Sequence, residues 1–320
     1  MKIVVLDGFT LNPGDNPWDA VARHGELAVH DRTPDELVVE RCSGAGIVLT
    51  NKTRLSARTL AALPELRLIC VLATGYNVVD VQKAAELGIP VCNVPEYGSD
   101  SVAQHAIALL LELTNLVGCY DKAVKSGQWS SSRDFTLVAD PLTELAGKTM
   151  GIVGLGHIGR RVAQIGHALG MDIAAYNPRL RIAPDGVPVT WLALDELFQK
   201  ADVVSLHCPL TSDNQGLVDS KRLALMKPHS FLINTSRGGL VNEHDLAAAL
   251  NSGALAGAAV DVAAQEPIPP GSPLLSARNC IITPHIAWAT LAARRRLMAT
   301  TADNVASFLA GAPQNVVNGV

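Results

Sequence analysis

The chain has 320 residues, enough for two domains with separate buried cores, so a small scaffold held together by disulfides is excluded. Hydrophobic residues make up 48% and charged residues 18%, which excludes a disordered chain, and the formal net charge of −4 leaves no basic excess for nucleic-acid binding. The six cysteines contain no CxxC pair, which indicates reduced thiols in a cytoplasmic protein rather than a metal site or a disulfide framework.

No segment is apolar for long enough to predict a membrane span. The densest apolar run, residues 106–113, is interrupted by Glu112 well before the ~20 residues that a span requires. The apolar stretch at the N-terminus ends at Asp7, too early for a signal peptide, and is typical of a first strand.

Short β-branched runs alternate with helical patterns over the first ninety residues. Strands are expected at 3–6, 27–30, 46–49, 68–72 and 90–92. Helices are expected at 57–63 and 81–87, followed by Pro64 and Gly88, which are typical helix stops. This alternation predicts a parallel sheet with crossover helices.

A second alternating pattern follows a long helix. Residues 101–116 carry apolar side chains on most faces of a helix, which predicts a buried helix at the junction of two domains. After a loop at 126–140, strands are expected at 149–153, 172–176, 203–207, 230–234, 256–262 and 280–283, and a closing helix begins at Ala289. The sequence therefore predicts an α/β protein with two doubly wound parallel sheets.

A glycine-rich loop joins the strand expected at 149–153 to a helix expected at 160–169. In GxGxxG, the first glycine permits a tight turn, the second lets the backbone approach a pyrophosphate, and the third lets helix and strand pack closely. The helix N-terminus adds unpaired N–H groups and a positive dipole end. The motif also occurs at ordinary turns, but the strand before it and the helix after it favour dinucleotide binding by Gly154, Gly156, His157, Ile158 and Gly159.

The end of the next strand bears on the choice between NAD and NADP. Asn177 stands where a carboxylate would accept hydrogen bonds from the adenosine ribose of NAD. Arg179 and Arg181 follow, and they could attract a 2′-phosphate or simply lie in a solvated loop. The sequence slightly favours NADP(H) over NAD(H), and we expect the protein to use both.

Three polar side chains follow predicted strands of the second half: Arg237, Glu266 and His285. Open α/β sheets bind ligands at this end of their strands. The Arg237 guanidinium can bind a carboxylate through two parallel hydrogen bonds, and His285 can exchange a proton near neutral pH. Glu266 could accept from one imidazole nitrogen, which would fix the tautomer and favour the protonated ring. Taken alone, an arginine at the position of Arg237 is more often part of an ion pair, a carboxylate such as Glu266 is usually just solvated, and a histidine such as His285 is more often a core residue.

Together, these motifs resemble those of the D-isomer-specific 2-hydroxyacid dehydrogenases in order and spacing, over nearly the whole length. The resemblance rests on residues 154–159, 203–211, 234–239, 259–266 and 283–285. Within that family, residues 127–135, 141–149 and 284–290 are similar to glycerate dehydrogenases, also called hydroxypyruvate reductases.

The resemblance implies a Rossmann NAD(P)-binding domain, residues 100–288, inserted in a flavodoxin-like substrate-binding lid domain made of residues 1–99 and 289–320. It implies catalytic roles for Arg237, Glu266 and His285, with Arg237 and His285 also binding substrate. The backbone of Thr74 and Gly75 would bind the substrate carboxylate. The further cofactor contacts that it implies are Val102, His207, Cys208, Pro209, Thr235, Ser236 and Asp261.

The resemblance also implies a homodimer, built on the long helix and a loop that carries Trp129 and Phe135. One departure from the family is Gln104, which stands where Glu is common. The implied reaction is reduction of a small 2-oxo acid, hydroxypyruvate or glyoxylate, to the D-2-hydroxy acid, with His285 as proton donor. The alternatives are phosphite or formate oxidation, although formate-oxidising members would carry Gln at the position of Glu266, and a non-catalytic NAD(H)-sensing protein on the same fold.

Overall fold

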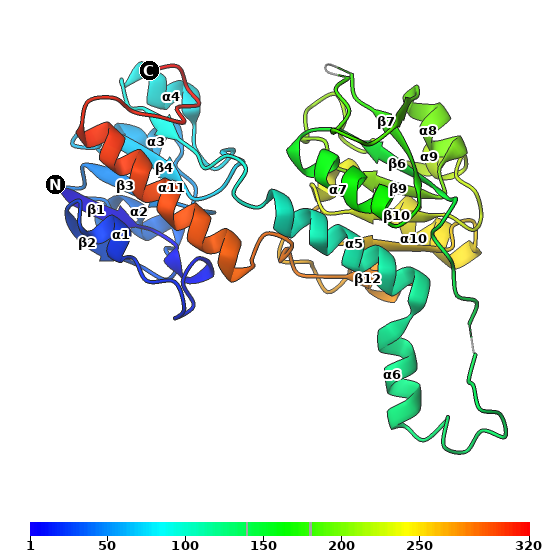
Figure 1. Ribbon diagram of the computed structural model, residues 1–320. Coiled ribbons are helices and arrows are strands. Elements are labelled where there is room, and N and C mark those ends of the chain that lie inside the picture. Colours follow the sequence, from blue (N-terminus) through cyan, green and yellow to red (C-terminus); the bar gives the residue numbers. More distant parts are fainter. Residues whose placement is uncertain (139, 179–180) are drawn as a thin grey trace. The chain divides into compact units, whose positions relative to one another are not determined.

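The computed structural model describes residues 1–138, 140–178 and 181–320 (Figure 1). The chain divides into two compact units. Unit 1 combines Met1–Gly98 with Trp288–Val320, and unit 2 is Ser99–Ala287. Each unit contains a parallel sheet with helices, which confirms the predicted fold class. Arg179, an expected cofactor contact, lies outside the described residues.

Unit 1 contains a five-stranded parallel sheet in the order β2-β1-β3-β4-β5. This order is typical of flavodoxin-like folds, in which the chain winds outwards in both directions from a switch point. The strands are β1 (Lys2–Val5), β2 (Glu26–Val29), β3 (Ile47–Thr50), β4 (Leu68–Val71) and β5 (Val91–Cys92).

The sheet of unit 1 is buried on both faces. Along β3, Ile47 and Leu49 pack in one hydrophobic cluster and Val48 in another, because successive side chains of a strand point to opposite faces. Leu297 and Val305 of the last helix, α11, pack with Ile47 and Leu49, so the far end of the chain completes this core. The helices are α1 (Asp19–Ala22), α2 (Val38–Arg41), α3 (Ala57–Ala61), α4 (Val81–Glu86) and α11 (Leu291–Leu309), with short 3-10 helices η1 (Gly8–Thr10) and η2 (Asp35–Leu37).

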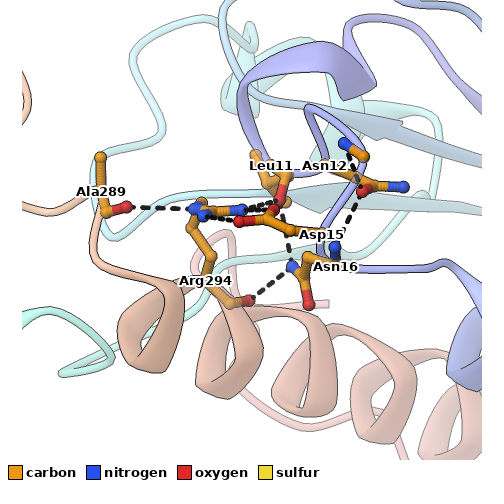
Figure 2. Close-up of polar contacts among 7 residues, drawn as sticks. Leu11, Asn12, Asp15, Asn16, Ala289 and Arg294 are labelled. Carbon is orange, nitrogen blue, oxygen red and sulfur yellow. Dashed lines mark hydrogen bonds and ion pairs between the residues drawn. The ribbon is translucent and has the colours of Figure 1, made fainter.

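A buried arginine fixes the start of α11 to a loop near the N-terminus (Figure 2). Arg294 is only 7% exposed. Its guanidinium donates to both carboxylate oxygens of Asp15, at 2.5 and 2.7 Å, to the Leu11 carbonyl at 3.1 Å and to the Ala289 carbonyl at 3.0 Å. The Asn16 side chain also donates to the carbonyls of Leu11 and Arg294. Each of the three guanidinium nitrogens therefore donates at least one hydrogen bond, as burial of the charge demands.

Unit 2 contains a seven-stranded parallel sheet in the order β12-β11-β10-β9-β6-β7-β8. Counted from β6, this is the 3-2-1-4-5-6 order of the Rossmann fold with a seventh strand added. Phe231 and Ile233 of β10 pack on one face and Leu232 on the other. The strands are β6 (Thr149–Val153), β7 (Asp172–Tyr176), β8 (Val189–Trp191), β9 (Val203–Leu206), β10 (Phe231–Asn234), β11 (Gly257–Val260) and β12 (Cys280–Ile282).

The helices of unit 2 include one that the sequence did not predict. Helix α5 (Ser99–Asn115) ends before Leu116, because a φ of 53° at Leu116 interrupts the helix. Helix α6 (Val117–Lys125) follows, where no helix was expected. The Glu112 carboxylate accepts a hydrogen bond from Gly118 N at 3.0 Å, in the first turn of α6. The remaining helices are α7 (His157–Ala168), α8 (Leu194–Lys200), α9 (Ser220–Leu223) and α10 (Glu243–Ser252), with η3 (Gly238–Leu240) and η4 (Pro273–Ser276).

Figure 1 shows α6 projecting from the sheet of unit 2. Among the described residues, no single helix is long and apolar enough to cross a membrane. Helices α5 and α6 taken together have the length and composition of a span, but they are bent by 53° at their junction.

Candidate active site

The glycine-rich loop of unit 2 joins β6 to α7 and packs too closely for a side chain at two of its three glycines. A Cβ atom at Gly154, where φ is +93°, would lie 2.7 Å from Cys208 N. A Cβ at Gly159 would lie 2.2 Å from the Gly154 carbonyl oxygen. A Cβ at Gly156, the N-cap of α7, would meet no atom within 4 Å. The outer glycines are therefore needed for packing, while the middle one borders open space at the helix N-terminus, where a phosphate fits.

Helix α7 begins at His157, three residues earlier than expected. Arg160 N donates to the Gly156 carbonyl at 2.9 Å, which closes the first helical turn. His157 and Ile158 thus lie in the first turn of α7, the end of a helix at which phosphates bind. These residues are candidates to bind a dinucleotide phosphate.

The loops after β9 and β10 adjoin the glycine-rich loop. Ser236 Oγ donates to the Cys208 carbonyl at 2.6 Å, so the two loops are joined. His207 Nε2 lies 2.8 Å from Ser205 Oγ, and burial lowers the pKa of His207 to about 4, so its ring is neutral near pH 7. The buried hydroxyl of Thr235 has no hydrogen-bond partner among the described residues, which fits a polar group bound beside it.

Glu266 and His285 form a close pair. His285 Nδ1 lies 2.6 Å from Glu266 Oε2, and the two side chains are 26% and 35% exposed, respectively. The other oxygen of Glu266 accepts from Ala263 N at 3.1 Å, within its own loop. The carboxylate is therefore held by the backbone and orients the imidazole, whose Nε2 has no partner within the described part of the chain.

Asp261 holds the segment that carries His285. Its main-chain carbonyl accepts from His285 N at 2.8 Å, and its carboxylate accepts from Ile286 N at 2.9 Å and from Ala287 N at 2.8 Å. This segment needs support, because His285 has a φ of 55°, which residues other than glycine rarely adopt. The sequence suggested Asp261 only as a cofactor contact, and that contact stays a prediction.

Arg237 follows β10 with an exposed side chain. Its carbonyl accepts from the Asn234 side chain at 2.9 Å, and its guanidinium donates to the Ser236 carbonyl at 2.7 Å. A Cβ at Gly238 would lie 1.9 Å from the Ala263 carbonyl carbon, so the loop of Arg237 packs directly on the loop of Glu266. Arg237, Glu266 and His285 thus follow three adjacent strands, β10, β11 and β12, at one edge of the sheet.

The other predicted site residues lie in four places. Val102 is buried in α5, Pro209 is exposed beyond β9, and Asn177 directly follows β7. Thr74 and Gly75 belong to unit 1, where they follow β4; Thr74 Oγ1 donates to the Val94 carbonyl at 2.9 Å. Among the described residues, no group of three or more His, Cys, Asp or Glu side chains could hold a metal ion.

Comparison with known proteins identifies the family. The sequence profile described as D-isomer specific 2-hydroxyacid dehydrogenase, NAD binding domain, matches residues 107–287. The chain is 48% identical to a hydroxypyruvate reductase of Blautia hydrogenotrophica, covering 99% of this chain and 100% of the relative. It is 41% identical to a glycerate dehydrogenase of Methylorubrum extorquens, covering 99% and 98%.

A solved structure adds to these relatives. The NADPH-dependent glyoxylate/hydroxypyruvate reductase of Sinorhizobium meliloti, in complex with NADP and malonate, is 29% identical, with a TM-score of 0.84 over 99% of this chain and 96% of that one. The fold and the relatives together show the class of the protein: it is an NAD(P)-dependent oxidoreductase that acts on the CH–OH group of its donors. The chain belongs to the D-isomer-specific 2-hydroxyacid dehydrogenase family, which confirms the predicted resemblance.

Proposed function

We propose that the protein reduces hydroxypyruvate or glyoxylate to the D-2-hydroxy acid. The observation that carries this proposal is the 2.6 Å contact between His285 Nδ1 and Glu266 Oε2 at the carboxyl edge of the nucleotide-binding sheet. It leaves a histidine with one nitrogen held and the other available for proton transfer. The names of the relatives from Blautia and Methylorubrum support the choice of substrate.

The residues divide the chemistry among them. A nicotinamide dinucleotide held at the glycine-rich loop of Gly154, Gly156 and Gly159 would supply hydride chemistry at C2 of the 2-oxo acid. His285 Nε2 gives its proton to the carbonyl oxygen as negative charge develops there, and Glu266 keeps the ring oriented. Arg237 binds the substrate carboxylate and polarises the carbonyl. The family resemblance also predicts that the backbone of Thr74 and Gly75, in unit 1, binds the substrate carboxylate.

Steady-state kinetics with purified protein test this function. Loss of nicotinamide absorbance is measured with hydroxypyruvate, glyoxylate, pyruvate and a bulky 2-oxo acid. His285→Ala is expected to lower kcat by at least ~100-fold, because it removes the general acid. His167→Ala, at an exposed position in α7, is the matched control. Tight cofactor binding without turnover of any acid would favour the NAD(H)-sensing alternative, and near-normal kcat in His285→Ala would remove that residue from the mechanism.

We assign the enzyme a slight preference for NADP(H) over NAD(H), with use of both. Asn177, which follows β7, offers no carboxylate to repel a 2′-phosphate. The NADPH-dependent glyoxylate/hydroxypyruvate reductase of Sinorhizobium meliloti supports this preference. Separate titrations with NADPH and NADH test it.

We further propose that the enzyme is cytoplasmic and that it forms a homodimer. Its six cysteines are all free, which supports a reducing compartment. Apolar side chains stand exposed on α6 and the segment after it: Val117 by 64%, Trp129 by 48%, Phe135 by 91% and Leu142 by 53%. Such a surface favours burial against a second copy. Light scattering of wild type and of Phe135→Ser tests the dimer, and a monomeric wild type would contradict it.

A further inference from the structure

We propose that His105 and Thr283 are positioning residues for His285, acting on it through Asp261. This inference rests on the proposed role of His285 as proton donor. It concerns side chains that touch neither the reacting pair nor the glycine-rich loop in the contacts described above. It assigns a function to a histidine of α5 that the nucleotide-binding motif leaves unexplained.

The Asp261 carboxylate is the centre of the arrangement. It is 1% exposed, so it depends on protein donors in place of water. Three donors come from the segment around His285: Ile286 N, Ala287 N and Thr283 Oγ1, the last at 2.6 Å from Oδ1. The carboxylate thus holds this segment on both sides of His285.

Thr283 links this carboxylate to α5. A hydroxyl group has one hydrogen, and Thr283 gives it to Asp261. His105 Nε2 lies 3.0 Å from Thr283 Oγ1, so the histidine must be the donor in that contact. The direction of donation is therefore fixed from His105 to Thr283 to Asp261.

His105 also faces the carboxylate itself. Its Nε2 lies 3.5 Å from Asp261 Oδ1, and within the described ranges it is the only Lys, Arg or His nitrogen within 4.0 Å of that carboxylate. Loss of Thr283 Oγ1 would remove one of the three donors of the carboxylate, leave Oδ1 with Ile286 N, and let the carboxylate shift. His285, at its φ of 55°, would move with it. A displacement of roughly 1 Å in a catalytic group can cost about 100-fold in rate.

Kinetics of paired variants in the full chain test the arrangement. Thr283→Val is close in shape and removes both hydrogen bonds, while Thr283→Ser keeps them. We expect Thr283→Val to lower kcat by about 10- to 100-fold, with the dissociation constant for NADPH within twofold of wild type. Thr283→Ser should restore most of the loss. His105→Leu should lower kcat, and the double variant His105→Leu/Thr283→Val should be no slower than Thr283→Val alone, because the two side chains act in series.

Amide hydrogen exchange of a peptide covering residues 283–288 gives a readout that does not depend on turnover. Exchange at Ile286 and Ala287 should be faster in Thr283→Val and in His105→Leu than in wild type and Thr283→Ser. Unchanged exchange in both variants, a Thr283→Ser as slow as Thr283→Val, or multiplying losses in the double variant would overturn the inference. A wild type that reduces no 2-oxo acid would overturn the proposed function instead, and exchange would still decide the role of Thr283 and His105.

Discussion

Arg294 offers a sharp test of how a buried charge contributes to the stability of unit 1. The change Arg294→Met keeps an unbranched apolar stem in α11 but removes every donor of the guanidinium. The carbonyls of Leu11 and Ala289 then lose a charged partner, although Leu11 keeps its bond from Asn16. Asp15 is half-exposed, so water replaces that contact and we assign it no energy.

The expected loss follows from these contacts. A hydrogen bond to a charged group contributes about 1.5–3 kcal/mol net. Two such bonds are removed, but one carbonyl retains a partner, and removal of the buried charge relieves its desolvation cost. We therefore expect unit 1 to lose about 2–3 kcal/mol, which lowers its melting temperature by about 5–10 °C.

Differential scanning calorimetry of the wild type, Arg294→Met and Arg295→Met measures this change in melting temperature. Arg295→Met is the matched control, because Arg295 is the next residue of α11 and is exposed. It should melt within about 2 °C of wild type, as surface changes usually do. Equal melting of wild type and Arg294→Met, or an equal loss in both variants, would refute the reasoning.

Three further predictions concern unit 2. Burial lowers the pKa of His207 from 6.5 to about 4, so between these pH values the unfolded chain binds a proton that the folded chain does not. The free energy of unfolding of the wild type should therefore fall as the pH is lowered from 6.5 to 4. In urea titrations over that range, His207→Gln should lose less stability than the wild type, and equal losses would contradict this prediction. Asn177→Asp should shift the ratio of kcat/KM values towards NADH, and an unaltered ratio would place cofactor selection elsewhere. Arg237→Lys keeps the charge but loses the planar fork, so KM for hydroxypyruvate should rise and kcat should fall; unchanged kinetics would count against the carboxylate-binding role.

Much of the fold is readable because its signals are local. The eleven strands expected from the sequence are all present, with ends that differ by at most two residues. Strand β8 was missed because its three residues are partly or fully exposed and give no apolar run. Helix α7 was expected to start at 160 because Gly156 and Gly159 weaken a helical pattern, but close packing on β6 makes Gly159 necessary inside the helix.

The candidate site was readable only in part. Arg237, Glu266 and His285 follow strands, so the topology that the sequence predicts brings them to one edge of the sheet. The contact of His105 with Thr283 spans 178 residues, and no periodicity or spacing in the chain indicates it. The use of the Asp261 carboxylate by the backbone of Ile286 and Ala287 depends on a loop conformation that sequence patterns do not specify.

The composition of unit 1 from two distant stretches constrains how the protein is made. During synthesis, Met1–Gly98 leaves the ribosome long before α11, because all of unit 2 lies between them. Until then, the face of β3 that carries Ile47 and Leu49 lacks the helix that supplies Leu297 and Val305. Unit 2 can complete its sheet before α11 is synthesised, while this apolar face of Met1–Gly98 still lacks part of its cover. Chaperone binding to nascent chains should therefore persist on the first stretch until α11 emerges.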